Sequence, residues 1–299
     1  DIVIADGSKV DLHSASTGRA LESTGGNLTV SGGAALAVTS NASNTTSAVY
    51  VEKETTICDG GKITVKVEKN ANGAGGTGGG LRTKLLVISN GSLTSENIST
   101  DSNAYAAYSP AVHITSGITL TSGGTLEAHS QDGYGIYTYG VLDVQRGSAV
   151  ISGGKKAILM ANGSSVSITA PVCIVNAGAD TAGTDTSIVT KPTAGTLGSS
   201  KYKYIRIETE FAPVISVTEK SGKLAVELRT DGSLGEALLV AVRYDANGKL
   251  LEVQRVDVEA GTVTANETIP FVMTAGDSYK VFLLDVNGAP LCAAAAGTV

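Results

Sequence analysis

Several residue types are scarce in this chain of 299 residues, and each shortage excludes a class of protein. Tryptophan is absent, Phe and Pro number 3 and 6, and charged residues make up only 17%. A disordered chain is rich in charge and poor in hydrophobic residues, whereas 42% of these residues are hydrophobic. Long amphipathic helices are disfavoured by the 37 Gly, each of which costs about 1 kcal/mol in a helix relative to Ala. The composition therefore predicts a turn-rich β protein of one large or two smaller domains.

The charges and the cysteines limit the partners. A formal net charge of -6 argues against nucleic-acid binding, which needs a basic face. No apolar stretch reaches the roughly 18 residues needed to span a bilayer, so we expect no membrane-spanning segment. Cys58, Cys173 and Cys292 lie too far apart for a structural zinc site, and we expect them to be buried as small apolar residues, with one disulfide and a free thiol as the alternative. Because Asp1 opens directly into apolar residues, we interpret the chain as a mature or trimmed part of a larger protein, whose other domains are further partners.

Two sequence elements recur in the same order over the first two thirds of the chain. One is a turn that ends on a glycine and leads into alternating apolar residues, with Gly33, Gly61, Gly91, Gly124 and Gly147 as its glycines. The other precedes it and reads Arg19-Ala20-Leu21, Ala48-Val49-Tyr50, Gly80-Leu81-Arg82, Ala106-Ala107-Tyr108, Gly135-Ile136-Tyr137 and Ala157-Ile158-Leu159. Units of roughly 23 to 33 residues are too small to bury a core alone, but the stacked coils of a parallel β-helix cover one another. Leucine-rich repeats and propeller blades, the alternatives, fit neither the residue pattern nor the period.

The pattern changes near residue 210, which predicts two domains, 1–209 and 210–299. After this point glycine becomes rarer and the strand patterns lengthen, with turn signals at Asp231-Gly232, Asn247-Gly248 and Asn287-Gly288. Several strands in a segment of this size are typical of a small antiparallel β-sandwich. For the ends of the helical stack, we expect residues 1–18 to form one cap and Tyr202–Glu208 a last strand.

The strings Gly135-Ile136-Tyr137 and Gly140-Val141-Leu142-Asp143-Val144 resemble right-handed parallel β-helices of the pectate-lyase-like superfamily. More narrowly, they are similar to bacterial surface proteins of that shape with carbohydrate-binding or adhesin-like roles. The stretch Val240–Leu251, with Val281-Phe282-Leu283-Leu284-Asp285, resembles immunoglobulin- or fibronectin-like modules appended to extracellular bacterial proteins. The resemblance implies an all-β chain, an extracellular or cell-surface location and, among the enzymes of the superfamily, cleavage of pectin or other polysaccharides.

Catalytic candidates follow from that resemblance. Lyases of this fold use an Arg or Lys base beside carboxylates that hold calcium, and calcium needs several oxygen ligands at once. The acids in question are Asp101, Glu127, Asp132 and Asp143, which stand apart in the sequence, so we expect no metal or cofactor, with calcium as the alternative. Glycoside hydrolases of this fold carry an Arg-Ile-Lys string, and the corresponding Arg206-Ile207-Glu208 has an acid instead of the lysine.

Tyrosines are the glycan-binding candidates: Tyr50, Tyr108, Tyr134, Tyr137 and Tyr139. Tyr50, Tyr108 and Tyr137 occupy matching positions of the repeat. If Ala107 and Ile136 face inward, Tyr108 and Tyr137 face outward on neighbouring coils about 4.8 Å apart. Exposed rings hold the flat faces of sugars by apolar contact and hydroxyl hydrogen bonds, although such rings also form structural ladders or pack under loops.

These observations favour a non-enzymatic extracellular or cell-surface protein that binds a polysaccharide or cell-surface glycan, or acts as an adhesin. A polysaccharide lyase or glycoside hydrolase acting on pectin-like polymers is the alternative, and a structural stalk without a ligand is a further one.

Overall fold

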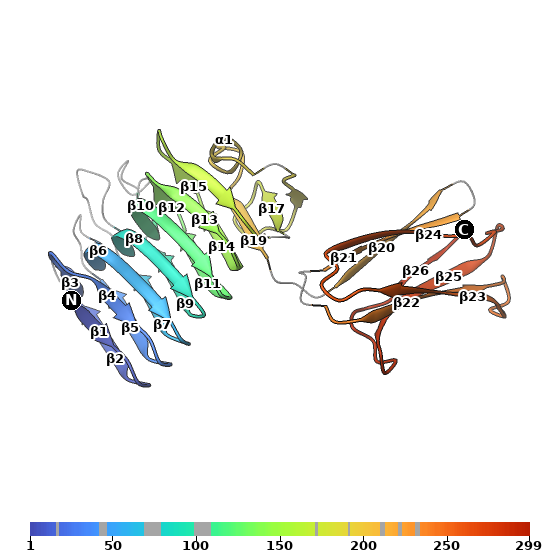
Figure 1. Cartoon of the computed structure of the whole chain (residues 1–299). Helices are drawn as coiled ribbons and strands as arrows, with labels where there is room; N and C mark the ends of the chain where they lie inside the picture. The colour runs from blue at the N-terminus through green and yellow to red at the C-terminus, as the bar shows by residue number, and fades with distance from the viewer. Residues whose placement is uncertain are drawn as a thin grey trace. The chain divides into compact units, whose positions relative to one another are not determined.

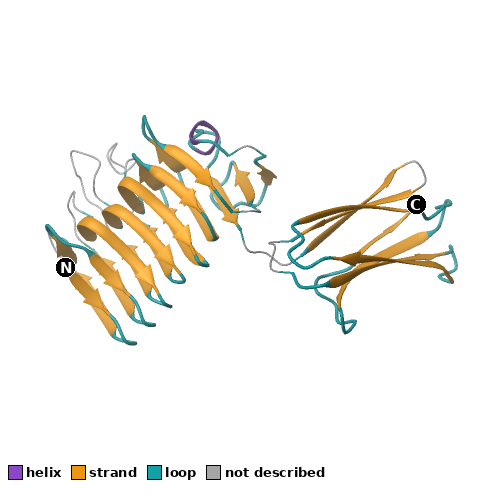
Figure 2. Cartoon of the chain, viewed as in Figure 1, coloured by secondary structure: helices purple, strands orange, loops and turns teal. Residues whose placement is uncertain are grey.

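The computed structural model describes residues 1–15, 18–41, 47–68, 79–98, 109–170, 173–190, 192–209, 213–220, 223–230 and 234–299. It is nearly all β and divides into two compact units, Asp1–Thr209 and Glu210–Val299 (Figures 1 and 2). Residues 210–212, at the boundary expected near residue 210, lie outside the described residues.

The first unit is a parallel β-solenoid with two sheets, as the repeat predicted (Figure 1). The first sheet contains β1 (Ile2–Ile4), β3 (Leu21–Ser23), β4 (Leu28–Val30), β6 (Val49–Cys58), β8 (Leu81–Ser89), β10 (Val112–Thr121), β12 (Tyr134–Thr138), β13 (Val141–Val144), β15 (Lys156–Met160) and β16 (Ser165–Ile168). The second contains β2 (Lys9–Ser14), β5 (Ala35–Ser40), β7 (Lys62–Val67), β9 (Ser92–Asn97), β11 (Gly124–Ser130), β14 (Gly147–Gly153), β17 (Ile174–Gly178), β18 (Thr186–Ile188) and β19 (Tyr204–Glu208). The helix α1 (Ala194–Leu197) is a single turn.

Aliphatic residues from both sheets fill the solenoid interior in columns, one residue per coil. In the second sheet Leu36, Ile63, Leu93 and Leu126 are successive register partners, and each is at most 1% exposed. Alternate residues on the same strands face outward and are mostly polar, which is the period-two pattern of a strand buried on one face. The apolar side of each coil is therefore buried only when the coils stack.

The glycine turns stack as a column at one corner of the coils. Register places Gly61, Gly91, Gly124 and Gly147 at equivalent positions, each directly before or at the start of a second-sheet strand. The assignment of Gly33 to this column is wrong by one residue, because Ala35 pairs with Lys62 and so Ala34 occupies the position. The preceding residues carry the sharp turn, as at Asp59 and Gly60, whose φ angles are 50° and 78°.

The second repeated element is also confirmed by the register, except in one coil. Leu21, Val49, Leu81, Ile136 and Ile158 are inward-facing equivalents in the first sheet, as their strings predicted. The string Ala106-Ala107-Tyr108 does not fill the remaining position, because Val112 pairs with both Leu81 and Ile136. Tyr108 itself lies outside the described residues. The sequence pattern placed this coil's element too early, because the connection between β9 and β10 is longer than the equivalent connection between β11 and β12.

The two ends of the solenoid differ. The expectation of a separate cap in residues 1–18 is wrong, since β1 and β2 join the parallel ladders of β4 and β5 as strands of the first coil. At the other end β19 pairs antiparallel with β14 and with β17. The Thr209 hydroxyl accepts a hydrogen bond from the Gly147 amide and donates one to the Gly147 carbonyl oxygen at 2.8 Å. This reversal ends the parallel stack by covering the edge of β14.

The second unit consists of two antiparallel sheets, as predicted for this segment. One contains β20 (Val214–Lys220), β21 (Lys223–Arg229) and β24 (Thr264–Ile269), in the order β20-β21-β24. The other has the order β23 (Leu250–Val258), β22 (Ala237–Tyr244), β25 (Ser278–Asp285) and β26 (Ala295–Thr298). The core of this unit contains Leu224 and Leu228 from the three-stranded sheet and Leu239 and Leu283 from the four-stranded one, all fully buried.

Candidate functional site

An outward-facing column of large side chains follows the first sheet from coil to coil. Its members are register partners on six successive strands: Glu22, Tyr50, Arg82, His113, Tyr137 and Leu159. We call this set the outer column. Adjacent members are about 4.8 Å apart along the sheet, so Tyr50 and Tyr137 are about 14 Å apart and share no direct contact. The predicted tyrosine ladder is therefore a mixed column of aromatic, cationic and acidic side chains.

His113 is the most unusual member of the outer column. Its side chain is 4% exposed, and neither ring nitrogen has a hydrogen-bond partner among the described residues. The imidazole lies parallel to the Tyr137 ring, with the two planes at 4° and the centroids 4.8 Å apart. Burial, and secondarily the charge of Arg82, lowers the pKa of His113 from 6.5 to about 4. The ring is therefore neutral at physiological pH and presents one N–H donor and one acceptor.

Tyr137 and Tyr139 extend this stack toward solvent. Their ring centroids are 4.9 Å apart, their hydroxyls are hydrogen-bonded to each other, and Tyr139 is 47% exposed. Burial, and secondarily the Tyr139 hydrogen bond, raises the pKa of Tyr137 to about 12, so its hydroxyl stays protonated. Tyr134 differs from both because it is only 4% exposed, with the Lys155 ammonium 5.5 Å from its ring centroid.

Tyr50 lies between two guanidinium groups. Arg19 and Arg82 are 4.0 and 5.5 Å from its ring centroid, at distances typical of cation–π contacts. Arg19 also forms an ion pair with Glu22. Arg82 has no carboxylate partner among the described residues, so it adds a positive charge to the middle of the outer column.

The four acidic candidates do not come together. Asp101 lies outside the described residues. Glu127 is on β11 of the second sheet, whereas Asp143 is on β13 of the first sheet and accepts a hydrogen bond from the Gln145 amide at 2.8 Å. Asp132 is exposed in the short connection between β11 and β12.

Glu127 belongs instead to a shallow hollow of about 310 Å³ on the outer face of the second sheet. Glu96, His129, Ser152 and Tyr204 are successive register partners there, with the His129 Nδ1 atom 2.6 Å from the Ser152 hydroxyl. The Glu127 carboxylate accepts a hydrogen bond from the Thr94 hydroxyl at 3.3 Å. The hollow thus combines carboxylates, an imidazole and hydroxyls beside an aromatic ring.

The sequence pattern identified the tyrosines of the outer column but not His113 and Arg82. Both residues directly follow an inward-facing aliphatic residue, as Tyr50 and Tyr137 do, and this spacing is the signal that was present in the sequence. Glu96 and Tyr204 were missed because only the register of β9, β11, β14 and β19 brings them to the hollow.

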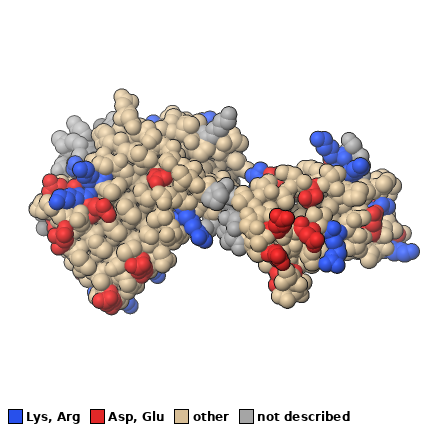
Figure 3. Space-filling model, viewed as in Figure 1, with Lys and Arg blue, Asp and Glu red and all other residues tan. Residues whose placement is uncertain are grey.

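Several general properties of the described residues bear on function. They contain no group of three or more His, Cys, Asp or Glu side chains suited to a metal ion. Within the described ranges, no helix combines the length and the apolar character that crossing a membrane requires. The three cysteines are free thiols, and all are partly exposed rather than fully buried as expected. On the face of the molecule shown in Figure 3, charged side chains are sparse and both signs are intermixed.

Comparison with known proteins gives no family. No family model and no curated protein sequence matches this chain. Nine chains of solved structures match it. One is an endonuclease/exonuclease/phosphatase from Beutenbergia cavernae DSM 12333, at 14% identity and a TM-score of 0.22, over 33% of this chain and 32% of that one. Another is a calcium-binding mutant of Bacteroides uniformis beta-glucuronidase 2, at 12% identity and a TM-score of 0.21, over 35% of this chain and 16% of that one.

The matched segments therefore span about a third or less of those two proteins. TM-scores this low do not establish a shared fold, so neither protein contributes to the functional argument.

Proposed function

We propose that the chain is a non-enzymatic, extracellular or cell-surface protein that binds a polysaccharide through the outer column of its solenoid. The observation that carries the proposal is the stacked cluster of His113, Tyr137 and Tyr139 beside the Arg82 guanidinium. Exposed tyrosine faces suit the apolar faces of sugar rings, and a guanidinium donates to sugar hydroxyls or carboxylates. Because the column runs along the coils, successive sugar units of a polymer find binding groups at regular spacing.

The folds of the two units support an adhesin-like role. Parallel coils closed by an antiparallel strand are in keeping with the resemblance to pectate-lyase-like surface proteins. The strand orders β20-β21-β24 and β23-β22-β25-β26 are in keeping with an immunoglobulin- or fibronectin-like module. In this proposal the solenoid presents the glycan site and the sandwich is an accessory module of the same surface protein.

A glycan array that includes polygalacturonate and xylan tests the proposal. We expect Tyr137→Ala and Tyr139→Ala each to weaken binding of the recognised glycan about tenfold, because each removes a ring from the platform. Arg82→Ala distinguishes acidic from neutral glycans, since it weakens binding of polygalacturonate more than binding of xylan. Tyr244→Ala, which removes a tyrosine of the second unit, is the matched control and leaves binding unchanged. If the double variant Tyr137→Ala, Tyr139→Ala binds the glycan as tightly as the wild type does, the outer column is not the binding site.

Polysaccharide cleavage is the second candidate, and the hollow containing Glu96 and Glu127 is the observation that favours it. Glycosidases use two carboxylates that flank the scissile bond. Product analysis on the same polymers decides between the candidates: products that disappear in Glu127→Gln identify an enzyme. Unsaturated products that disappear on calcium chelation identify a lyase instead. No binding and no products in either assay favour a structural stalk.

A further inference from the structure

The two outer faces of the second unit differ in chemistry. The face formed by β20, β21 and β24 is polar, with Ser216, Thr218, Glu227, Asn266 and Thr268 among its outward-facing residues. The opposite face, formed by β22, β23 and β25, presents Leu238, Val240, Val242, Leu251, Val253, Phe282 and Leu284, together with the charged Arg255, Asp257 and Lys280. None of the seven apolar side chains belongs to the core cluster of the sandwich, although Val242 is only 9% exposed. We call this second surface the apolar face.

The apolar face is continuous across its strands. Val240 pairs with Phe282, Leu238 with Leu284, and Val242 with Val253. Leu251 and Val253 are 44% and 47% exposed on the edge strand β23. A contiguous apolar surface of this kind is rare on monomers and marks an interaction site. Its side chains are mostly aliphatic and offer few hydrogen-bonding groups, so it suits a protein surface rather than a sugar.

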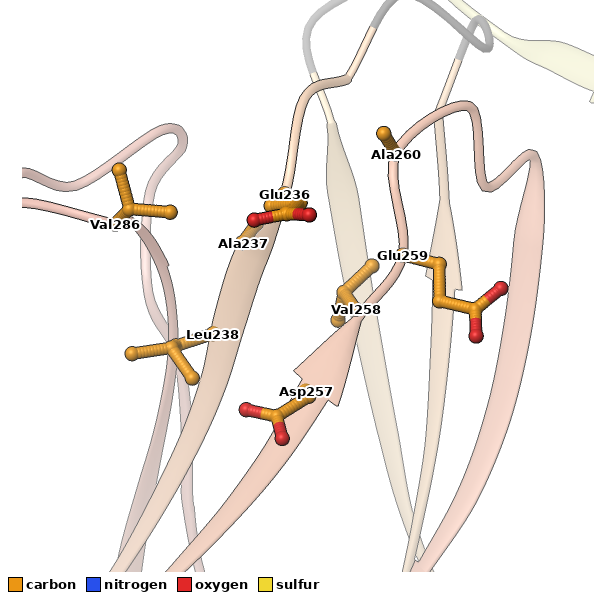
Figure 4. A pocket seen from close by; sticks show the side chains of 8 residues that line it. All are labelled: Glu236, Ala237, Leu238, Asp257, Val258, Glu259, Ala260 and Val286. Atoms are coloured by element: carbon orange, nitrogen blue, oxygen red, sulfur yellow. The ribbon is translucent and has the colours of Figure 1, made fainter.

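A hollow of about 610 Å³ lies at one end of the apolar face (Figure 4). Leu238, Val258 and Val286 are among its apolar lining residues, and the carboxylates of Glu236 and Asp257 lie beside it. Glu259 also lines the hollow, but its carboxylate points away from the other two (Figure 4). The hollow therefore suits an apolar side chain that is accompanied by a positive charge.

The opposite end of the same face carries such a group. The turn between β22 and β23 places Lys249 directly before Leu250, and both residues are exposed, Leu250 by 53%. Because β22 runs from the hollow to this turn, the acidic hollow and the basic, apolar tip lie at opposite ends of one surface. Two copies can pack with their apolar faces together and their strands running in opposite directions, related by a two-fold axis that lies between the faces and perpendicular to the strands. This arrangement brings the tip of each copy to the hollow of the other.

We propose that the chain forms a two-fold symmetric homodimer through the apolar face, with Lys249 and Leu250 of each copy seated in the acidic hollow of the other. Sheets pack face to face about 10 Å apart, which is the geometry this requires. The three strands of the apolar face, each eight or nine residues long, cover about 400 Å² per copy, or about 800 Å² in total. The seated tips add to this area, and an interface of this size belongs to the weak, transient class, so we expect the dimer to dissociate in the micromolar range.

Sedimentation equilibrium of the full chain from roughly 1 to 200 μM tests the proposal. We expect a monomer–dimer equilibrium for the wild type and at least a tenfold weaker one for Val253→Glu, which buries a charge within the interface. Thr268→Glu adds the same charge on the polar face and leaves the equilibrium unchanged. Circular dichroism and thermal unfolding verify that both variants fold. A chain that stays monomeric, or equal dissociation constants for the two variants, overturns the proposal.

A charge exchange tests the antiparallel arrangement. Lys249→Glu and Glu236→Lys each place like charges together and weaken the dimer, whereas the double variant restores opposite charges and recovers most of the affinity. A double variant that dimerises no better than the single ones contradicts the placement of the tip in the hollow. None of these variants changes a residue of the outer column. The tests of dimer formation and of glycan binding are therefore independent of each other.

Discussion

At the scale of a single residue, the neighbours of the buried His113 ring determine its stability and its protonation. Its ring nitrogens find no hydrogen-bond partner among the described residues, and burial without one costs stability because the nitrogens lose their water. Stacking on Tyr137 offsets part of that cost, and the nearby Arg82 opposes protonation of the ring.

The lowered pKa of His113 predicts how stability depends on pH. Between pH 6.5 and about 4 the unfolded chain binds a proton at this residue that the folded chain does not. Stability is therefore complete above pH 6.5 and falls as the pH is lowered through this window. We expect the wild type to lose on the order of 1–2 kcal/mol more than His113→Phe between pH 7 and pH 5, measured by urea unfolding. Equal losses in the two proteins contradict the assigned pKa.

The stacked glycine corner shows at the scale of the element why one residue type recurs in coil after coil. At Gly124 an added Cβ lies 2.3 Å from the Ile88 carbonyl oxygen, and at Gly61 it lies 2.2 Å from that of Val30. The close approach leaves no room for a side chain at these corners. Ala34 fills the equivalent place one coil earlier, so the restriction depends on the local separation of the coils.

Substitution at this corner predicts a loss of stability. We expect Gly124→Ala to destabilise the first unit by about 2–3 kcal/mol, because the new methyl group collides with the backbone of the coil below. Thermal unfolding measures the effect. Gly195→Ala is the control, since its added methyl group lies 3.8 Å from its nearest neighbour, and it leaves stability nearly unchanged. If Gly124→Ala unfolds at the same temperature as Gly195→Ala, the coils can move apart at this corner to accept a methyl group.

The whole molecule depends on how its stack of coils ends. The strand β19 is antiparallel to both β14 and β17, so it joins the last parallel coil to the β17–β18 hairpin. Without it, two strands present open ladder groups. The Thr209 hydrogen bonds to Gly147 hold the end of β19 in place and mark the last residue of the first unit.

Two truncations test this closure. We expect fragment 1–209 to unfold cooperatively and remain soluble, because the ladders on both sides of β14 are complete. Fragment 1–201 lacks β19, and the exposed edges of β14 and β17 promote association. Light scattering and circular dichroism compare the two fragments at equal concentration. Equal solubility and equal cooperativity would show that β19 is dispensable.

Much of this architecture is predictable from the sequence because it depends on local repeats. Glycine turns and period-two alternation predicted the second-sheet strands β5, β7, β9, β11 and β14 and the antiparallel sheets of the second unit. The site was less predictable. Tyr137 and Tyr139 were named beforehand and lie together, whereas the neighbour of Tyr137 is His113 rather than the expected Tyr108.

The sequence by itself determined that coils form, because a short strand with one apolar face buries that face only against another such strand. Only the tertiary structure decided which outward residues become neighbours. Connections of unequal length shift the register without disturbing the interior, since Val112, Ile136 and other aliphatic residues fill the same column equally well. An outward residue has no such constraint, and its partners follow from the register alone. For that reason His113 and Arg82, which share with Tyr50 and Tyr137 only their place after an inward-facing residue, lie in the middle of the proposed binding surface.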